Sequence, residues 1–201
     1  YLKENTLNHP MSDEIINTYP TNYNLIIKRI NAEIPEGKKI WYQKHMAHHL
    51  LSVKNLSWIK NFHNCILIRH PKLVINSYVK KNSLSSVYEL GYPQQLSIIK
   101  FLKKEKLKFC IIDSEDFLKN PEKKINDWCD FLKIDFQKNM LSWPKGAHIN
   151  DGIWGKHWYN KINNSSKFSR IERSFSQDYK QFNCIYNDAK KIYKKIYNMV
   201  E

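Results

Sequence analysis

The chain has 201 residues and a formal net charge of +14, and 42% of its residues are hydrophobic and 13% aromatic. This apolar content excludes a disordered chain, and the length fits a single α/β domain over residues 1–201. The lysines are spread along the chain among acidic residues, which argues against a dedicated nucleic-acid interface but favours anionic ligands in general.

The beginning of the sequence indicates whether the domain is complete, and the cysteines indicate the cellular compartment. The chain opens on Tyr1 without a strand-like apolar run, so we expect an N-terminally truncated domain. No apolar run approaches the length of a membrane span. Cys65, Cys110, Cys129 and Cys184 lie far apart in apolar patterns without a CxxC pair, which predicts reduced core thiols in a cytoplasmic protein.

Residues 38–43 are the first predicted strand, and Lys44 and His45 follow it directly. A histidine titrates near neutral pH, so His45 at a strand end is a candidate general base. The alternative is a surface or capping histidine.

His45, His48 and His49 share the i, i+3, i+4 spacing of side chains on one helix face, which suits metal chelation. No cysteine or carboxylate lies close to them in the sequence. We therefore expect no metal.

The apolar run at residues 65–68 predicts a strand that is buried on both faces and leads into a helix over 72–81. Pro71 suits the first turn of that helix, whose unpaired N–H groups and dipole attract anions. Arg69 ends the strand, and Ser77 lies on the second helical turn. Since the chain has few arginines, a guanidinium, which binds phosphate with a planar fork, favours an anion site at this junction. The alternative is a surface arginine in a loop.

The next elements again form a buried strand that is followed by a helix. A helix is expected at 94–105, a buried strand at 109–112 and an amphipathic helix at 121–133. Alternating strands and helices imply a parallel sheet with helices on both faces, a three-layer α/β fold whose ligands bind at the carboxyl ends of the strands. Asp113 and Glu115, which follow the strand at 109–112, are expected on the same rim as Arg69.

The last third holds an ordered, aromatic-rich loop at 142–168 and a closing amphipathic helix at about 185–200. No GxxxxGK[ST], GxGxxG or GxSxG motif occurs in the chain. An intact P-loop nucleotidase is therefore excluded for this sequence, and nothing indicates an acyl hydrolase.

Several segments together resemble the sulfotransferase family. ILIRHPKLVINSY at residues 66–78 resembles the family's 3′-phosphate segment, and QKHMAHHLL at 43–51 resembles the segment of its catalytic histidine. The stretch at 113–135 is similar to the acidic pair, Asn-Pro and helix that follow a later strand. LSWP at 141–144 and DGIWGKHWY at 151–159 resemble a bacterial sulfotransferase-like subgroup.

The resemblance implies a P-loop-type fold that binds 3′-phosphoadenosine 5′-phosphosulfate (PAPS) as donor, without a metal. The sulfuryl group would pass to a hydroxyl or amine of a small molecule or glycan. Arg69 and Ser77 would bind the 3′-phosphate, His45 would accept the acceptor's proton, and Lys44 would neutralise charge on the transferred group. The family's first strand and 5′-phosphosulfate loop would precede Tyr1.

The role of one aromatic cluster and the function of the protein have alternatives. Trp154, His157 and Trp158 either close over the nucleotide or acceptor or form a structural cluster. The protein itself is alternatively a kinase-like phosphoryl transferase on the same scaffold, or a non-catalytic basic module that binds RNA or another polyanion. A sulfotransferase is expected to prefer adenosine 3′,5′-bisphosphate to ATP, whereas a polyanion binder is expected to show steep salt dependence.

Overall fold

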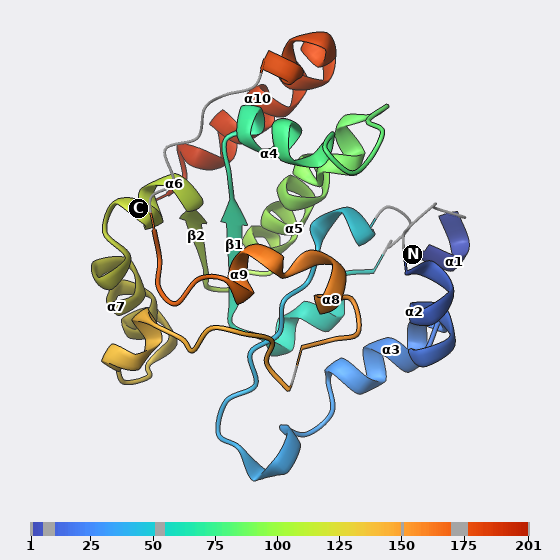
Figure 1. Ribbon diagram of the computed structural model, residues 1–201. Coiled ribbons are helices and arrows are strands. Elements are labelled where there is room, and N and C mark those ends of the chain that lie inside the picture. The colour runs from blue at the N-terminus through green and yellow to red at the C-terminus, as the bar shows by residue number, and fades with distance from the viewer. Residues whose placement is uncertain (1, 6–10, 51–54, 150, 170–176, 201) are drawn as a thin grey trace. The chain divides into compact units, whose positions relative to one another are not determined.

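The computed structural model describes residues 2–5, 11–50, 55–149, 151–169 and 177–200, and Figure 1 labels their elements. The described residues belong to two compact units. The first unit comprises Tyr1–Lys44 and Gln137–Phe168, and the second comprises His45–Phe136 and Ser169–Glu201. The single domain over 1–201 stays a prediction.

The second unit contains a parallel pair of strands, β1 (Asn64–Ile68) and β2 (Phe109–Asp113). Asn64 pairs with Phe109 and Ile68 with Asp113, so the carboxyl ends of the two strands lie together. Both strands form where the apolar runs predict them, but residues 109–112 of β2 are only partly buried. The three-layer sheet stays a prediction, because these two are the only strands that the described residues form.

Two expectations about the sheet are wrong. Residues 38–43 form no strand, since Ile40 and Tyr42 are 58% and 69% exposed and no described strand pairs with them. Strand β1 is not buried on both faces either. Its residues Ile66 and Ile68 are buried, whereas Leu67, which points to the other face, is 61% exposed.

Five helices of the second unit connect or flank the strands. They are α4 (Pro71–Tyr78), α5 (Tyr92–Lys104), α6 (Ser114–Lys119), α7 (Pro121–Leu132) and α10 (Asn183–Tyr197). These bounds confirm the helices expected at 94–105, 121–133 and 185–200 to within three residues. Helix α4 ends three residues before the expected bound, where the side chain of Asn82 donates to the carbonyl of Tyr78 at 3.2 Å.

Short 3₁₀ turns complete the second unit. They are η2 (Ala47–Leu50), η3 (Ser57–Asn61), η4 (Val87–Leu90) and η6 (Gln177–Phe182). Turn η2 packs against η4 and against the start of α5. This packing joins the histidine-containing segment to the helix that precedes β2.

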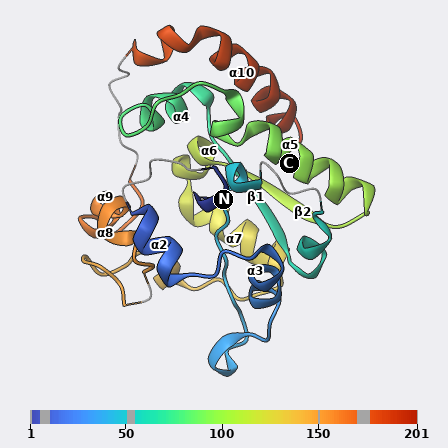
Figure 2. The same ribbon diagram turned by 90° about the vertical axis from the view of Figure 1, so that its right-hand side faces the viewer.

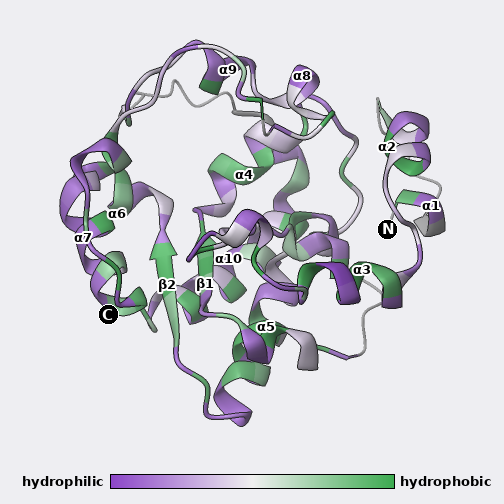
Figure 3. Ribbon diagram, turned by 90° about the horizontal axis from the view of Figure 1, so that it is seen from below, coloured by the Kyte–Doolittle hydropathy of each residue, from purple (hydrophilic) through white to green (hydrophobic). Residues whose placement is uncertain are grey.

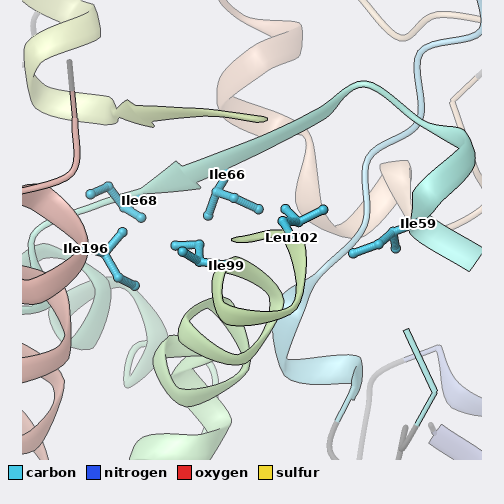
Figure 4. Packing of buried hydrophobic residues seen from close by; sticks show 6 residues of the cluster. All are labelled: Ile59, Ile66, Ile68, Ile99, Leu102 and Ile196. Atoms are coloured by element: carbon cyan, nitrogen blue, oxygen red, sulfur yellow. The ribbon is translucent and has the colours of Figure 1, made fainter. Parts of the chain in front are cut away.

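The core of the second unit lies on one face of β1, between this strand and helices α5 and α10 (Figure 4). Its fully packed side chains are aliphatic: Ile59, Ile66, Ile68, Ile99, Leu102 and Ile196. Figure 3 shows β2 as hydrophobic along most of its length, whereas α7 carries both hydrophobic and hydrophilic residues. The apolar stripe of α7 includes the buried side chains of Ile125 and Cys129, as its helical spacing predicts.

The first unit contains helices α1 (Leu2–Asn5), α2 (Ser12–Thr18) and α3 (Tyr23–Ile30), the turns η1 (Pro35–Gly37) and η5 (Lys138–Leu141), and helices α8 (Gly155–Trp158) and α9 (Asn160–Asn163). Figures 1 and 2 show α2 beside α8. Within the described ranges, no helix combines the length and the apolar character that crossing a membrane requires.

Candidate anion-binding site at the strand ends

Arg69 follows β1 directly, and Glu115 lies in the first turn of α6, which follows β2. The Nε atom of Arg69 lies 3.8 Å from Oε1 of Glu115. This ion pair confirms the expectation that Arg69 and Glu115 share one rim of the sheet. Parallel pairing explains it, because it brings the residues after both strands together.

Arg69 has an unsatisfied hydrogen-bond donor. Its Nη2 atom is buried, and within the described part of the chain it has no hydrogen-bond partner. The Oγ atom of Ser114, the first residue of α6, is buried and unpartnered in the same sense. Buried polar groups are rarely left unsatisfied. A guanidinium N–H requires an acceptor, and an oxyanion such as phosphate is the acceptor that a guanidinium fork suits best.

The backbone of Arg69 is anchored by Tyr92, the first residue of α5. The Tyr92 hydroxyl donates to the Arg69 carbonyl at 2.7 Å, and Tyr92 is only 2% exposed. Burial is the main cause that raises the pKa of Tyr92 above its ordinary value, so the phenol stays protonated and able to donate. The hydrogen bond fixes the turn between β1 and α4.

Helix α4 begins with its capping residue next to Arg69. The N-cap is His70, whose Nδ1 atom accepts from the Lys72 N–H at 3.3 Å, and Pro71 occupies the first helical position as predicted. Burial, and after it the charge of Lys190, lowers the pKa of His70. The imidazole is therefore neutral at pH 7 and can act as this acceptor.

Ser77 is exposed on the second turn of α4. Its neighbour Asn76 is buried and accepts a hydrogen bond from the backbone N–H of Tyr179 at 3.1 Å. The position of Ser77 on the helix is the expected one. Its participation in anion binding with Arg69 stays a prediction.

Helix α10 supports the same rim through Asp113. This carboxylate is 3% exposed, caps α6 by accepting from the N–H groups of Glu115 and Asp116, and accepts from the Tyr193 hydroxyl at 2.9 Å. Burial and this hydrogen bond raise the pKa of Tyr193. The closing helix is therefore bonded to the residue that ends β2.

His45 precedes η2 instead of following a strand. Its ring meets that of Trp58 edge to face, with 5.4 Å between the centroids. Burial lowers the pKa of His45, and it lowers the pKa of His48 as well. A neutral imidazole at pH 7 is the form that accepts a proton, so this environment is compatible with a general base.

Gly91 connects the histidine segment to the anion site. Its φ of +81° is left-handed, and a Cβ atom on it would lie 3.2 Å from the His48 backbone nitrogen and 3.4 Å from the Ala47 Cβ. The next residue is Tyr92, which holds Arg69. The start of α5 thus contacts both segments.

We expect Gly91→Ala to destabilise the protein by about 1 kcal/mol more than Gly37→Ala. Both glycines have positive φ, where an L-residue costs roughly 1–2 kcal/mol, but only Gly91 also faces backbone within close range. Gly37 has nothing within 4 Å and is the matched control. Free energies of unfolding from denaturant titrations measure the difference, and equal losses would show that the close approach at Gly91 carries no energetic weight.

Lys44 and the predicted aromatic cluster lie in the first unit. The Lys44 ammonium lies over the Tyr159 ring, 5.6 Å from its centroid. Trp154 packs against Tyr19 and donates from Nε1 to the Tyr159 hydroxyl at 3.3 Å. These contacts favour the structural interpretation of Trp154, and the role of Lys44 stays a prediction.

Sequence reasoning missed the residues that hold the site together, namely Gly91, Tyr92 and Tyr193. A Gly-x-Pro sequence at residues 91–93 marks a helix start and was a usable signal for Gly91. The hydrogen bonds of Tyr92 and Tyr193 join positions 23 and 80 residues apart, so local patterns contain no trace of them. Within the described residues, no group of three or more potential metal ligands is assembled.

Comparison with known protein families identifies the family to which the chain belongs. A profile described as a sulfotransferase domain matches residues 1–195, which implies an α/β domain of the P-loop-like type. The chain belongs to this sulfotransferase domain family. The resemblance of residues 43–51, 66–78 and 113–135 is thereby confirmed at the level of the family.

Two proteins of Arabidopsis thaliana are similar to the chain. Branched-chain-amino-acid aminotransferase-like protein 2 is 30% identical over 173 residues, which is 86% of this chain and 31% of that protein. Branched-chain-amino-acid aminotransferase-like protein 1 is 29% identical over 169 residues, 84% of this chain and 30% of that protein. The chain thus spans less than a third of the length of these relatives. No solved structure matches it.

Proposed function

We propose that the protein transfers a sulfuryl group from PAPS to a hydroxyl or amine acceptor. The observation that carries this proposal is the buried Nη2 of Arg69, which has no hydrogen-bond partner within the described residues and lies where the residues after β1 and β2 meet. Because the chain belongs to the sulfotransferase domain family, we assign a nucleotide 3′-phosphate as the group that accepts a hydrogen bond from Nη2.

In this proposal Arg69 and Ser77 bind the 3′-phosphate. The Nη2 atom donates to a phosphate oxygen, while Tyr92 holds the Arg69 backbone and Glu115 holds its Nε atom. The N-terminus of α4 adds the positive end of its dipole beside Arg69. The site therefore combines a guanidinium fork with a helix N-terminus, two features that both favour a dianion.

His45 accepts the proton of the attacking hydroxyl or amine, and Lys44 neutralises charge on the group in transfer. Burial keeps His45 neutral before the reaction. Positioning and charge stabilisation supply most of the rate enhancement in transfers of this kind, by analogy with phosphoryl transfer. The acceptor is a small molecule or a glycan.

The test is conversion of PAPS to adenosine 3′,5′-bisphosphate by the protein as its gene encodes it, with a panel of phenols, alcohols, amines and glycans as acceptors. Mass spectrometry of the products detects an acceptor heavier by one sulfuryl group. We expect at least one sulfated product that depends on the enzyme. Phosphorylated products formed from ATP, with none formed from PAPS, would instead identify the kinase-like alternative.

We expect the pH profile of this activity to keep its acid limb below the ordinary histidine pKa of about 6.5. The working form of a base is the deprotonated one, and burial lowers the pKa of His45, so activity is lost only as the pH falls through that lowered value. Measuring kcat/KM, which reports the pKa values of the free enzyme, between pH 4.5 and pH 8, limits chosen to bracket about 6.5, locates the limb. An acid limb centred above about pH 7 would contradict a buried His45 as the base.

A further inference from the structure

Two cysteines lie side by side on the neighbouring strands of the sheet. Cys65 in β1 and Cys110 in β2 are register partners, and both are free and partly exposed. Parallel partners project to the same face of a sheet, and neighbouring strands lie about 4.8 Å apart. This spacing falls within the Cα separation of about 4.4–6.8 Å that a disulfide requires.

The two thiols lie on the less covered face of β1. Side chains alternate along a strand, so Cys65 shares its face with Leu67, which is 61% exposed, and not with the buried Ile66. The remaining cysteines differ in their settings. Cys129 is buried in α7, and Cys184 is exposed at the start of α10.

The two thiols of the pair interact with each other. Their hydrogen bond lowers the pKa of Cys110 and, together with burial, raises the pKa of Cys65. A thiolate is the nucleophile in disulfide exchange, so ionisation of one member of the pair is enough to begin the reaction.

We propose that Cys65 and Cys110 form a reversible intramolecular disulfide by exchange with a low-molecular-weight disulfide such as oxidised glutathione. One cysteine of the pair, as its thiolate, attacks one glutathione sulfur, forms a mixed disulfide and releases one glutathione thiolate. The other cysteine then loses its proton and attacks the protein sulfur of the mixed disulfide, which releases the second glutathione. Two protein thiols are oxidised by two electrons, and one glutathione disulfide is reduced to two thiols.

The linkage would tie β1 to β2 a few residues before the strand ends that carry Arg69 and Asp113. The proposal does not depend on sulfuryl transfer. It concerns a modification site in the sheet, and its test needs no enzyme assay.

The experiment treats the natively folded protein, as its gene encodes it, with oxidised glutathione, alkylates the remaining thiols and maps the peptides by mass spectrometry. We expect a linked pair of peptides that contain Cys65 and Cys110, and loss of this link after dithiothreitol. Cys184→Ser, which removes the exposed thiol, is the matched control and should leave the link intact. If Cys65 and Cys110 both stay alkylatable while Cys184 is glutathionylated, the proposal is wrong.

Two variants test the mixed disulfide. Cys65→Ser and Cys110→Ser each remove one partner of the pair, so at least one of them should accumulate one glutathione on the remaining thiol, whereas the wild-type protein accumulates none on either. An unmodified remaining thiol in both variants, with native circular dichroism retained, would overturn the exchange mechanism. The peptide map of the wild-type protein decides the proposal even where the variants do not fold.

Discussion

His45→Ala should lower the turnover of sulfuryl transfer by about 10²- to 10⁴-fold, the usual contribution of a general base. Its affinity for adenosine 3′,5′-bisphosphate should stay nearly unchanged, because the proposed role of His45 concerns the acceptor's proton. Steady-state kinetics with PAPS measures the first effect, and calorimetric titration of the bisphosphate measures the second.

His48→Ala and His49→Ala are the matched controls for this substitution, since both residues lie in η2, three and four residues after His45. The account predicts turnover close to that of the wild-type protein in both. Normal turnover in His45→Ala combined with a large loss in His48→Ala would move the base to His48, whose pKa burial also lowers. Normal turnover in all three variants would remove histidine base catalysis from the account.

Arg69→Ala should weaken binding of adenosine 3′,5′-bisphosphate by about 1.5–3 kcal/mol, the range for a charge-assisted hydrogen bond, which corresponds to roughly 10- to 150-fold in Kd. Binding of adenosine 5′-phosphate should hardly change, because it lacks the 3′-phosphate. Removing Arg69 takes away the buried Nη2 that we assign to that phosphate. Calorimetry with both nucleotides measures the contrast.

Arg29→Ala is the charge-matched control, because Arg29 is an exposed arginine in the last turn of α3. It removes the same charge and should leave both affinities nearly intact. Equal losses for the two nucleotides in Arg69→Ala would show that Arg69 does not bind the 3′-phosphate. An equal loss in both arginine variants would point to the long-range field of the whole protein.

Local patterns in the sequence predicted most elements of the second unit. Short apolar runs at 65–68 and 109–112 correspond to β1 and β2, and helical spacing located α5, α7 and α10. The strand expected at 38–43 was wrong, because no strand of the described residues pairs with this segment. Ile40 and Tyr42 would share one face of such a strand, and their exposure shows that this face is not buried.

The candidate site was also predicted only in part, because local patterns locate the strands and helices but not the contacts between distant residues. Parallel pairing of two strands is enough to bring Arg69 and Glu115 together, and the sequence indicated that pairing. The anchors of the site depend on tertiary contacts instead. The hydroxyl of Tyr92 reaches the carbonyl of Arg69, and that of Tyr193 reaches Asp113, across distances in sequence that no local periodicity encodes.

The central claim is that the strand-end site recognises a 3′-phosphate and not negative charge in general. The most direct test compares adenosine 3′,5′-bisphosphate with its 2′,5′-isomer by calorimetry on the protein as its gene encodes it, because the two ligands carry the same charge. The account predicts that the 3′,5′-bisphosphate binds at least about 10-fold more tightly. Equal affinities that fall together and steeply with added salt would contradict it and favour a polyanion-binding module.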